Sequence, residues 1–230
     1  MARLPRLSVG GELHLVAQRG VAGAPLFLDP VDRTHYTDAL RDAAKECGVA
    51  VHAYVLLDDS VTLLLTPNDA PGLTRCMQRT ARRYVGGLNS RHQRQGSVWS
   101  GRFRSAVVEP VLLLPCMAYV EQAPVRLGLV ASAQEWPWSS AAHHVGRRAD
   151  PLVVEHPDLW RLGNTPFERE ARYREFMERM LTSKEMGAIS AALAGGWVLG
   201  SEAYVRSVEQ ATTRRVRPRA RGRPGMSHLT

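Results

Sequence analysis

The sequence has little lysine, little cysteine and no long apolar run. Of its 30 cationic residues only Lys45 and Lys184 are lysines, so arginine supplies nearly all of the positive charge. The three cysteines are odd in number and include no Cys-x-x-Cys, which indicates neither a disulfide framework nor a zinc site. No apolar run of about 18 residues occurs, and residues 1–6 lack the apolar stretch of a signal peptide. We therefore expect a cytoplasmic protein with no membrane partner.

Acidic residues are also in deficit, at 22 against 30 cationic ones, which gives a net charge of +8 and a pI near 10. A coding bias explains arginine in place of lysine, but it does not explain an excess of cations over anions. That excess favours a polyanionic partner, most simply nucleic acid. With 44% hydrophobic residues among 230, the chain can form one packed domain of about 150 residues and an appendage.

The apolar pattern of the first half of the chain predicts alternating strands and helices. Asp29 suits a helix N-cap, Pro30 suits the first helical position, and Gly48 suits the end of that helix. The predicted elements are, in order, a strand at 12–18, a helix at 29–48, two strands within 51–66, a helix at 70–89, a strand within 97–109 and a helix at 111–122. This order is that of an α+β, ferredoxin-like split βαβ fold, with an antiparallel sheet and helices on one face.

The two strands within 51–66 are joined by an acidic turn. Side chains two apart in a strand share a face. Asp58, Ser60 and Thr62 are therefore expected to point together into a site, while Val61 enters the core. An ordinary hairpin with a polar outer face explains the same pattern, and these residues alone do not decide between the two interpretations.

Arginine gathers in two places of this predicted domain. The helix at 70–89 is basic, and its four arginines form either a solvated face or a surface that contacts phosphates. The turn that leads into the fourth strand combines Trp99 with arginines, a mixture of stacking and charge that suits single-stranded nucleic acid. Trp99 on its own is more typical of a core anchor. The arginines are Arg75, Arg79, Arg82 and Arg83 on the helix, and Arg102 and Arg104 after the turn.

Beyond Gly146 the alternation of predicted strands and helices ends. A linker at 147–151 is followed by segments with helical patterns, and Ser201 suits the N-cap of the last of them. The predicted helices lie at 166–181, at 184–194 and shortly after Ser201. We therefore expect a domain at 1–146 and a C-terminal helical extension at 147–210.

The tail at 211–230 contains six arginines, two prolines and no acidic residue, so we expect it to be disordered when free. Its Arg221-Gly222-Arg223-Pro224 matches the core of an AT-hook, which lays arginines in the narrow minor groove of A·T-rich DNA. A general phosphate-binding tail is the alternative. Either interpretation makes Arg221 and Arg223 candidate DNA contacts.

Several motifs within residues 1–146 occur together in one known family. They are the strand from His14 to Gly20, His52-Ala53-Tyr54-Val55-Leu56, Val98-Trp99-Ser100-Gly101-Arg102-Phe103, the run from Tyr119 to Val130, and Trp136-Pro137-Trp138-Ser139-Ser140. In these motifs the chain resembles the REP-associated tyrosine transposases. The resemblance implies a ferredoxin-like nuclease domain that binds single-stranded or hairpin DNA, and it adds Arg19 and Arg126 to the candidate DNA contacts. The resemblance does not decide between a monomer and a homodimer, because the family includes both.

The chemistry of that family depends on a tyrosine hydroxyl, which is almost fully protonated at neutral pH. Two histidines and a polar residue four positions after the tyrosine hold Mg²⁺ or Mn²⁺, while the tyrosine forms a transient 5′-phosphotyrosine link. By resemblance, the nucleophile here is Tyr119 and the ligand positions are Ser60, Thr62 and Ala123. Because none of these three is a histidine or an amide, we expect no metal cofactor and a loss of metal-dependent strand cleavage.

Other interpretations stay open at this point. Asp58, with Glu121 or Gln122, supplies oxygen ligands that would suit Mg²⁺, in which case the protein is an active transposase. A non-catalytic repressor with a purely structural Tyr119 is the other alternative. Pro115 requires that the tyrosine helix either begins near it or is kinked. His14 and His52 are expected to satisfy local hydrogen bonds.

Overall fold

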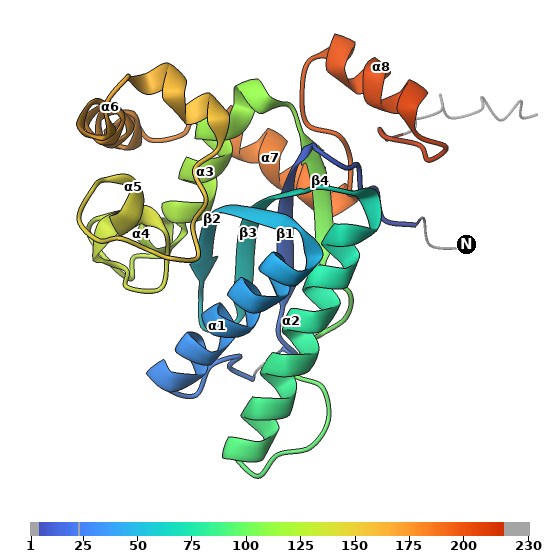
Figure 1. The fold of residues 1–230 in the computed structure, drawn as a ribbon, viewed down its shortest axis with the longest axis vertical. Coiled ribbons are helices and arrows are strands. Elements are labelled where there is room, and N and C mark those ends of the chain that lie inside the picture. Colours follow the sequence, from blue (N-terminus) through green and yellow to red (C-terminus); the bar gives the residue numbers. More distant parts are fainter. Residues whose placement is uncertain (1–4, 23, 219–230) are drawn as a thin grey trace, which may run out of the picture.

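The computed structural model describes residues 5–22 and 24–218. In this part of the chain four strands form one antiparallel sheet in the order β2-β3-β1-β4 (Figure 1). Their bounds are Leu13–Arg19 for β1, Val49–Leu56 for β2, Ser60–Pro67 for β3 and Arg104–Val108 for β4. This is the strand order of a split βαβ fold, so the predicted α+β, ferredoxin-like class is confirmed.

The long helices α1 (Pro30–Cys47) and α2 (Ala70–Arg91) pack together on one face of the sheet. The predicted ends of α1 are confirmed, because the Asp29 side chain caps the helix and Gly48 ends it with a φ of 63°. The core under these helices contains the rings of Tyr36 and Tyr84, whose centroids lie 5.3 Å apart.

The opposite face of the sheet is covered by α3 (Leu113–Glu121) and α7 (Ser183–Gly195), as Figure 1 shows. The two helices of the split βαβ units thus share one face, while the helix expected at 111–122 lies on the other. A short 3-10 turn, η1 (Pro110–Leu112), leads from β4 into α3. The remaining helical segments are α4 (Ala123–Arg126), η2 (Ala133–Glu135), α5 (Ala141–His144), η3 (Pro157–Leu162), α6 (Pro166–Glu178) and α8 (Glu202–Ala211). No helix of the described residues is long and apolar enough to cross a membrane.

The C-terminal helices begin at side-chain caps. Thr165 and Thr182 form capping boxes with Glu168 and Glu185. The predicted cap at Ser201 is confirmed, because its hydroxyl accepts a hydrogen bond from the Tyr204 amide. The helix expected at 166–181 ends earlier, at Glu178.

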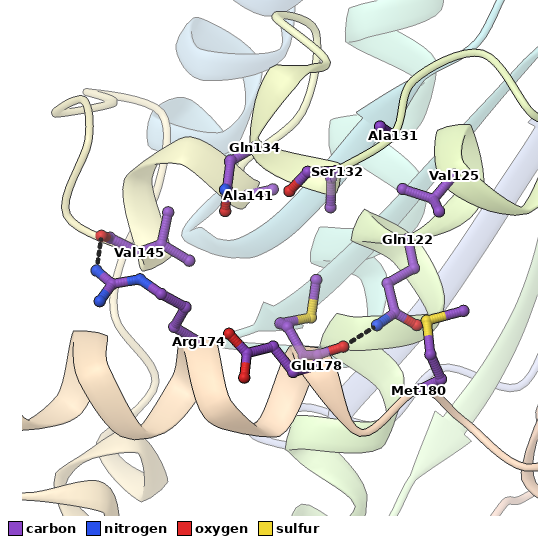
Figure 2. A pocket seen from close by; sticks show the side chains of 12 residues that line it. Gln122, Val125, Ala131, Ser132, Gln134, Ala141, Val145, Arg174, Glu178 and Met180 are labelled. Atoms are coloured by element: carbon purple, nitrogen blue, oxygen red, sulfur yellow. Dashed lines mark hydrogen bonds between the residues drawn. The ribbon is translucent and has the colours of Figure 1, made fainter.

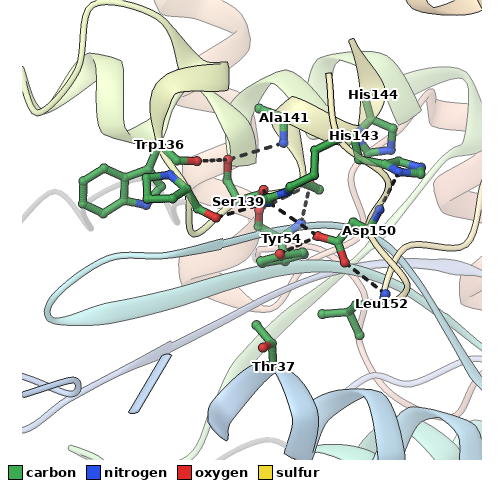
Figure 3. A network of polar contacts seen from close by, with 12 residues as sticks. Thr37, Tyr54, Trp136, Ser139, Ala141, His143, His144, Asp150 and Leu152 are labelled. Atoms are coloured by element: carbon green, nitrogen blue, oxygen red, sulfur yellow. Dashed lines mark hydrogen bonds and ion pairs between the residues drawn. The ribbon is translucent and has the colours of Figure 1, made fainter. Parts of the chain in front are cut away.

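Both edges of the sheet are covered by chain from beyond α3. At the β2 edge, the Leu56 amide donates to the Trp138 carbonyl over 2.9 Å. The Tyr54 hydroxyl donates to Asp150 over 2.6 Å, and burial raises the pKa of that tyrosine (Figure 3). At the β4 edge, the Leu199 amide donates to the Val107 carbonyl over 2.8 Å. The segment around Trp138 and the C-terminal extension together therefore protect the two edges that an open sheet would expose.

Residues 212–218 correct the prediction of a tail that is disordered from 211 onward. Val216 is fully buried, and its carbonyl accepts a hydrogen bond from the Val198 amide over 2.9 Å. Arg217 forms ion pairs with Glu202 and Glu209 of α8. One apolar side chain and acidic partners on α8 hold this stretch in place. Arg221 and Arg223 lie outside the described residues.

Candidate functional site

Ser60 and Thr62 lie on the face of β3 opposite the core residues Val61 and Leu63. This face lines a cavity of about 300 Å³, and Tyr119 and Ala123 line the same cavity from α3 and α4. We call this space the Tyr119 cavity. Its full lining is Ala17, Arg19, Leu57, Asp59, Ser60, Thr62, Tyr119, Ala123, Arg126, Leu127 and Leu193. The structure thus brings together the four positions that the resemblance assigns to the nucleophile and its ligands.

Pro115 does not displace Tyr119. Helix α3 begins at Leu113, so the proline is its third residue and lies in the first turn, where proline is tolerated. The first of the two alternatives for this helix is therefore correct. The helix breaks at Gln122 and resumes as α4, with the Leu127 amide donating to the Ala123 carbonyl over 3.1 Å. Both Tyr119 and Ala123 still line the cavity.

The turn between β2 and β3 turns Asp58 away from the cavity. Asp58 forms an ion pair with Arg33 of α1, on the other face of the sheet. Asp59 lines the cavity instead and accepts a hydrogen bond from the Ser60 hydroxyl over 2.7 Å. The Leu57 amide donates to the Ser60 carbonyl over 2.8 Å, which closes a tight turn over Asp58 and Asp59. Strand alternation stops at that turn, so it does not place Asp58 beside Thr62.

Arginines surround Tyr119. An adjoining cavity of about 300 Å³, here called the arginine cleft, is lined by Arg19, Arg102, Arg104 and Tyr119, among others. Arg126 lies over the Tyr119 ring, 4.9 Å from its centroid, and donates to the Tyr119 carbonyl over 2.5 Å. Burial lowers the pKa of Arg126. Four predicted DNA contacts, far apart in the sequence, thus converge on one tyrosine.

The other predicted contacts lie elsewhere. Helix α2, with its four arginines, packs on the face of the sheet opposite α3. Arg79 and Arg83 both bind Glu46 over 2.6 Å, and Arg75 binds Asp69 over 2.9 Å; Arg82 is exposed. Trp99 packs against the Tyr36 and Tyr84 rings, with centroids 6.2 and 6.1 Å away. The core-anchor interpretation of Trp99 therefore agrees with the geometry.

Sequence reasoning missed what fixes the tyrosine helix in place. Glu121 is fully buried, and Ser140, His144 and Tyr173 all bind its carboxylate, over 2.5, 2.6 and 2.8 Å. Burial, with Glu121 next to it, raises the pKa of Tyr173. Glu121 therefore faces Ser140 and His144 of the domain and Tyr173 of the extension, and it does not line the Tyr119 cavity. The signal was a single carboxylate in an otherwise apolar helix.

Gln122 is held in the same way. Its side-chain amide donates to the Met177 carbonyl of α6 over 2.7 Å (Figure 2). It lines a cavity of about 240 Å³ on the side of α3 that faces α6, where Arg174 donates to the Val145 carbonyl. Neither Glu121 nor Gln122 is among the residues that line the Tyr119 cavity.

No protein-family description matches the sequence, and no curated protein is similar to it in sequence. A solved structure of a REP-associated tyrosine transposase bound to a REP hairpin is similar to 68% of this chain and 93% of its own, with a TM-score of 0.56 and 15% identity.

This chain has the fold of a REP-associated tyrosine transposase. The resemblance inferred from the sequence motifs is thereby confirmed at the level of the fold. A proposed transposase from Deinococcus radiodurans R1 also matches, with a TM-score of 0.35, 22% identity and coverage of 53% of this chain and 94% of its own.

A tyrosine transposase fold implies a divalent ion beside the tyrosine, and the residues here do not fit one. Ser60 and Thr62 offer neutral hydroxyls and Ala123 offers a methyl group. Among the described residues that line the cavity, Asp59 is the one carboxylate. Within the described residues, the one cluster with metal-ligating spacing is Asp29, Asp32 and His92, between α1 and α2. Arg91 already forms ion pairs with both of those aspartates.

The strand histidines are not available as ligands either. His14 binds the Glu12 carbonyl over 2.7 Å and accepts from the Val9 amide over 3.2 Å. His52 binds the Val154 carbonyl over 2.7 Å and the Thr66 hydroxyl over 2.9 Å. Burial lowers the pKa of each to about 4. Both are structural residues, as their strand positions indicated.

Proposed function

We propose that this protein binds single-stranded or hairpin DNA at the Tyr119 cavity and the arginine cleft, and that it does not cleave DNA by the metal-dependent route. The observation that supports this proposal is the convergence of Arg19, Arg102, Arg104 and Arg126 on a tyrosine whose neighbouring ligand positions hold no metal ligand. The role is transposition-related, in line with the fold.

The arginines fit phosphate binding because of how they are held. Arg104 donates to the Ala194 carbonyl over 2.9 Å and Arg126 to the Tyr119 carbonyl, so both are oriented by neutral partners. Among the described residues, Arg19 and Arg102 form no ion pair. Guanidinium groups without carboxylate partners keep their charge and their donors free for phosphate oxygens.

Cleavage by the family's route requires charge stabilisation that these side chains do not provide. A bound divalent ion supplies several kcal/mol at a developing phosphate charge, and about 1.4 kcal/mol corresponds to a factor of ten in rate. Ser60 and Thr62 can donate hydrogen bonds to a phosphate, which supports binding. They do not replace two imidazole ligands. Binding without cleavage is the function that this residue set supports best, as in a repressor of related elements.

The test is an incubation of the full chain with hairpin DNA that carries a single-stranded extension, with and without Mn²⁺. We expect retarded migration of the DNA on a native gel and no covalent protein–DNA product on a denaturing gel. A metal-dependent adduct that disappears in Tyr119→Phe would show an active enzyme. Asp59 would then be the carboxylate in the cavity that can bind the metal ion. A lack of any DNA binding would refute the proposal itself.

A further inference from the structure

A third cavity, of about 380 Å³, lies where β4, the C-terminal end of α7 and residues 212–218 meet. It shares Arg102, Arg104 and Ala194 with the arginine cleft, so it continues the path that starts at Tyr119. We call it the Trp197 groove. Its walls come from the C-terminal extension as well as from the sheet, and its charged and aromatic lining residues are Arg6, Arg102, Phe103, Arg104, Trp197, Arg214 and Arg215.

Two glycines shape the groove around Trp197. Gly196 ends α7 with a φ of 66°, which turns the chain back over the helix end, and the Trp197 amide donates to the Ala192 carbonyl over 2.9 Å. A Cβ on Gly195 would lie 1.9 Å from the indole Nε1, so glycine at that position is what lets the ring lie against the helix end. Trp197 remains half-buried, with part of its surface open to the groove.

The groove is strongly basic, and no acidic side chain lines it in the part of the chain that the structure describes. The guanidinium groups of Arg214 and Arg215 lie 5.7 and 5.2 Å from the Trp197 ring centre. Arg214 donates to the Gly196 carbonyl over 2.7 Å, and the Nε atoms of Arg214 and Arg215 are buried without a hydrogen-bond partner in the described structure. Cations gathered this closely repel one another unless an anion joins them.

Aromatic and cationic groups arranged along one groove are what single-stranded nucleic acid requires. Arginines contact the backbone phosphates, and an aromatic face stacks on any base. The volume is within the range of sites that hold a small ligand such as a nucleotide. Because the groove is continuous with the arginine cleft, a DNA strand that lies in both runs from Tyr119 toward Trp197.

We propose that the Trp197 groove binds the single-stranded continuation of DNA held at the Tyr119 cavity, with phosphates at Arg214 and Arg215 and a base stacked on Trp197. This inference rests on the proposed function and adds to it a second subsite, built by the C-terminal extension. The extension is then part of the DNA-binding surface as well as a cover for the sheet edges.

The test compares a blunt hairpin with hairpins that carry single-stranded extensions of roughly four and eight nucleotides on either end. Affinity of the full chain is measured by fluorescence anisotropy. We expect an extension on one of the two ends to tighten wild-type binding, and Trp197→Leu to abolish that gain, a loss of about five- to a hundredfold, while blunt-hairpin binding stays unchanged. Leucine keeps the apolar packing and removes the stacking face.

Arg214→Gln combined with Arg215→Gln is the second variant. For the extended hairpin it should make the slope of log affinity against log salt shallower by about 1.4, because two phosphate contacts are lost. Matched controls are Trp160→Ala, an exposed tryptophan on η3, and the pair Arg82→Gln with Arg172→Gln, which changes net charge equally on other surfaces.

The possible failures are distinguishable. If Trp197→Leu and the arginine pair both keep the full gain from the extension, or if extensions give the wild type no gain, the Trp197 groove does not bind the strand although the proposed function stands. If the wild type does not bind even the blunt hairpin, the proposed function fails as well.

Discussion

At the scale of single residues, the buried histidines decide how this protein responds to acid. His14 and His52 are buried with both ring nitrogens in hydrogen bonds, and burial lowers the pKa of each to about 4. The unfolded chain has histidine pKa values near 6.5, so between pH 6.5 and 4 it binds more protons than the folded chain. Stability therefore rises with pH across this window and is lost as the pH falls through it.

This gives a prediction for unfolding by urea. At pH 5 each of the two histidines should lower the free energy of unfolding by about 2 kcal/mol relative to pH 7. His52→Gln should remove about 2 kcal/mol of this pH dependence, whatever it does to stability at pH 7. His14, together with His143 and His156, whose pKa values burial also lowers, accounts for the remainder. The half-buried Asp29, whose pKa is lowered to about 2 chiefly by its hydrogen bond with Arg91, titrates below this window. An unchanged pH dependence in the variant would contradict the assignment.

The cavity residues show what can and cannot be predicted from the pattern of a strand. Alternation along β3 correctly separated Ser60 and Thr62 from Val61, because a two-residue period holds inside a strand. It failed at Asp58, which lies in the turn, where hydrogen bonds between Leu57 and Ser60 set a different direction. Local turn geometry, not hydrophobic pattern, places Asp59 in the cavity.

Repair of the ligand positions tests the geometry of the cavity. Ser60→His, Thr62→His and Ala123→Asn together should create a Mn²⁺ site that the wild type lacks, because imidazole and amide groups suit that ion and the native side chains do not. Calorimetric titration with MnCl₂ measures the gain, and Ala123→Asn alone is the control. A folded triple variant with no gain in affinity would show that the three positions do not converge. We expect binding to return more readily than cleavage, since a misplacement near 1 Å costs about a hundredfold.

At the scale of elements, α3 connects the sheet to the extension. Its Tyr119 faces the cavity, and its Glu121 enters a buried group of Ser140, His144 and Tyr173 on the side of the extension. The position of the tyrosine therefore depends on Ser140, His144 and Tyr173, which follow Glu121 by 19, 23 and 52 residues. Because the partners lie so far along the chain, no local pattern could reveal this dependence.

Glu121→Ala should thus destabilise the protein by about 3 to 5 kcal/mol, since it leaves three buried polar groups without their partner. Glu175→Ala, at an exposed position on α6, should change stability by less than about 0.5 kcal/mol. Thermal unfolding followed by circular dichroism compares the two. Similar melting temperatures would mean that the buried carboxylate does not hold the helix.

The boundaries of the helices were predictable where caps define them, as at Asp29, Gly48 and Ser201. Residues 212–218 were not, because their arginine-rich composition is typical of disorder, while Val216 and the acidic partners of Arg217 act through tertiary contacts. Composition describes the average preference of a segment. A single buried valine can override it when the rest of the fold provides a site.

At the scale of the whole molecule, positive charge lies on two faces with different partners. On the α2 face, Arg75, Arg79 and Arg83 are neutralised by aspartate or glutamate. On the opposite face, Arg19 and Arg102 line a continuous path of cavities that contains Tyr119 and form no ion pair within the described residues. The sequence predicted both sets of arginines as DNA contacts, and only the fold separates them.

We propose that DNA binds on the Tyr119 face, and the most direct measurement of this compares two double variants with equal loss of charge. Arg19→Gln with Arg102→Gln removes two arginines beside Tyr119, and Arg79→Gln with Arg83→Gln removes two from α2. Fluorescence anisotropy with a hairpin that carries a single-stranded extension, at several salt concentrations, gives affinity and salt slope for each. We predict that the first pair weakens binding about tenfold and makes the slope shallower by about 1.4 to 1.8, while the second pair leaves both near the wild-type values. The reverse result, with binding lost in the α2 pair and kept in the Tyr119 pair, would place the DNA on the other face and contradict the account.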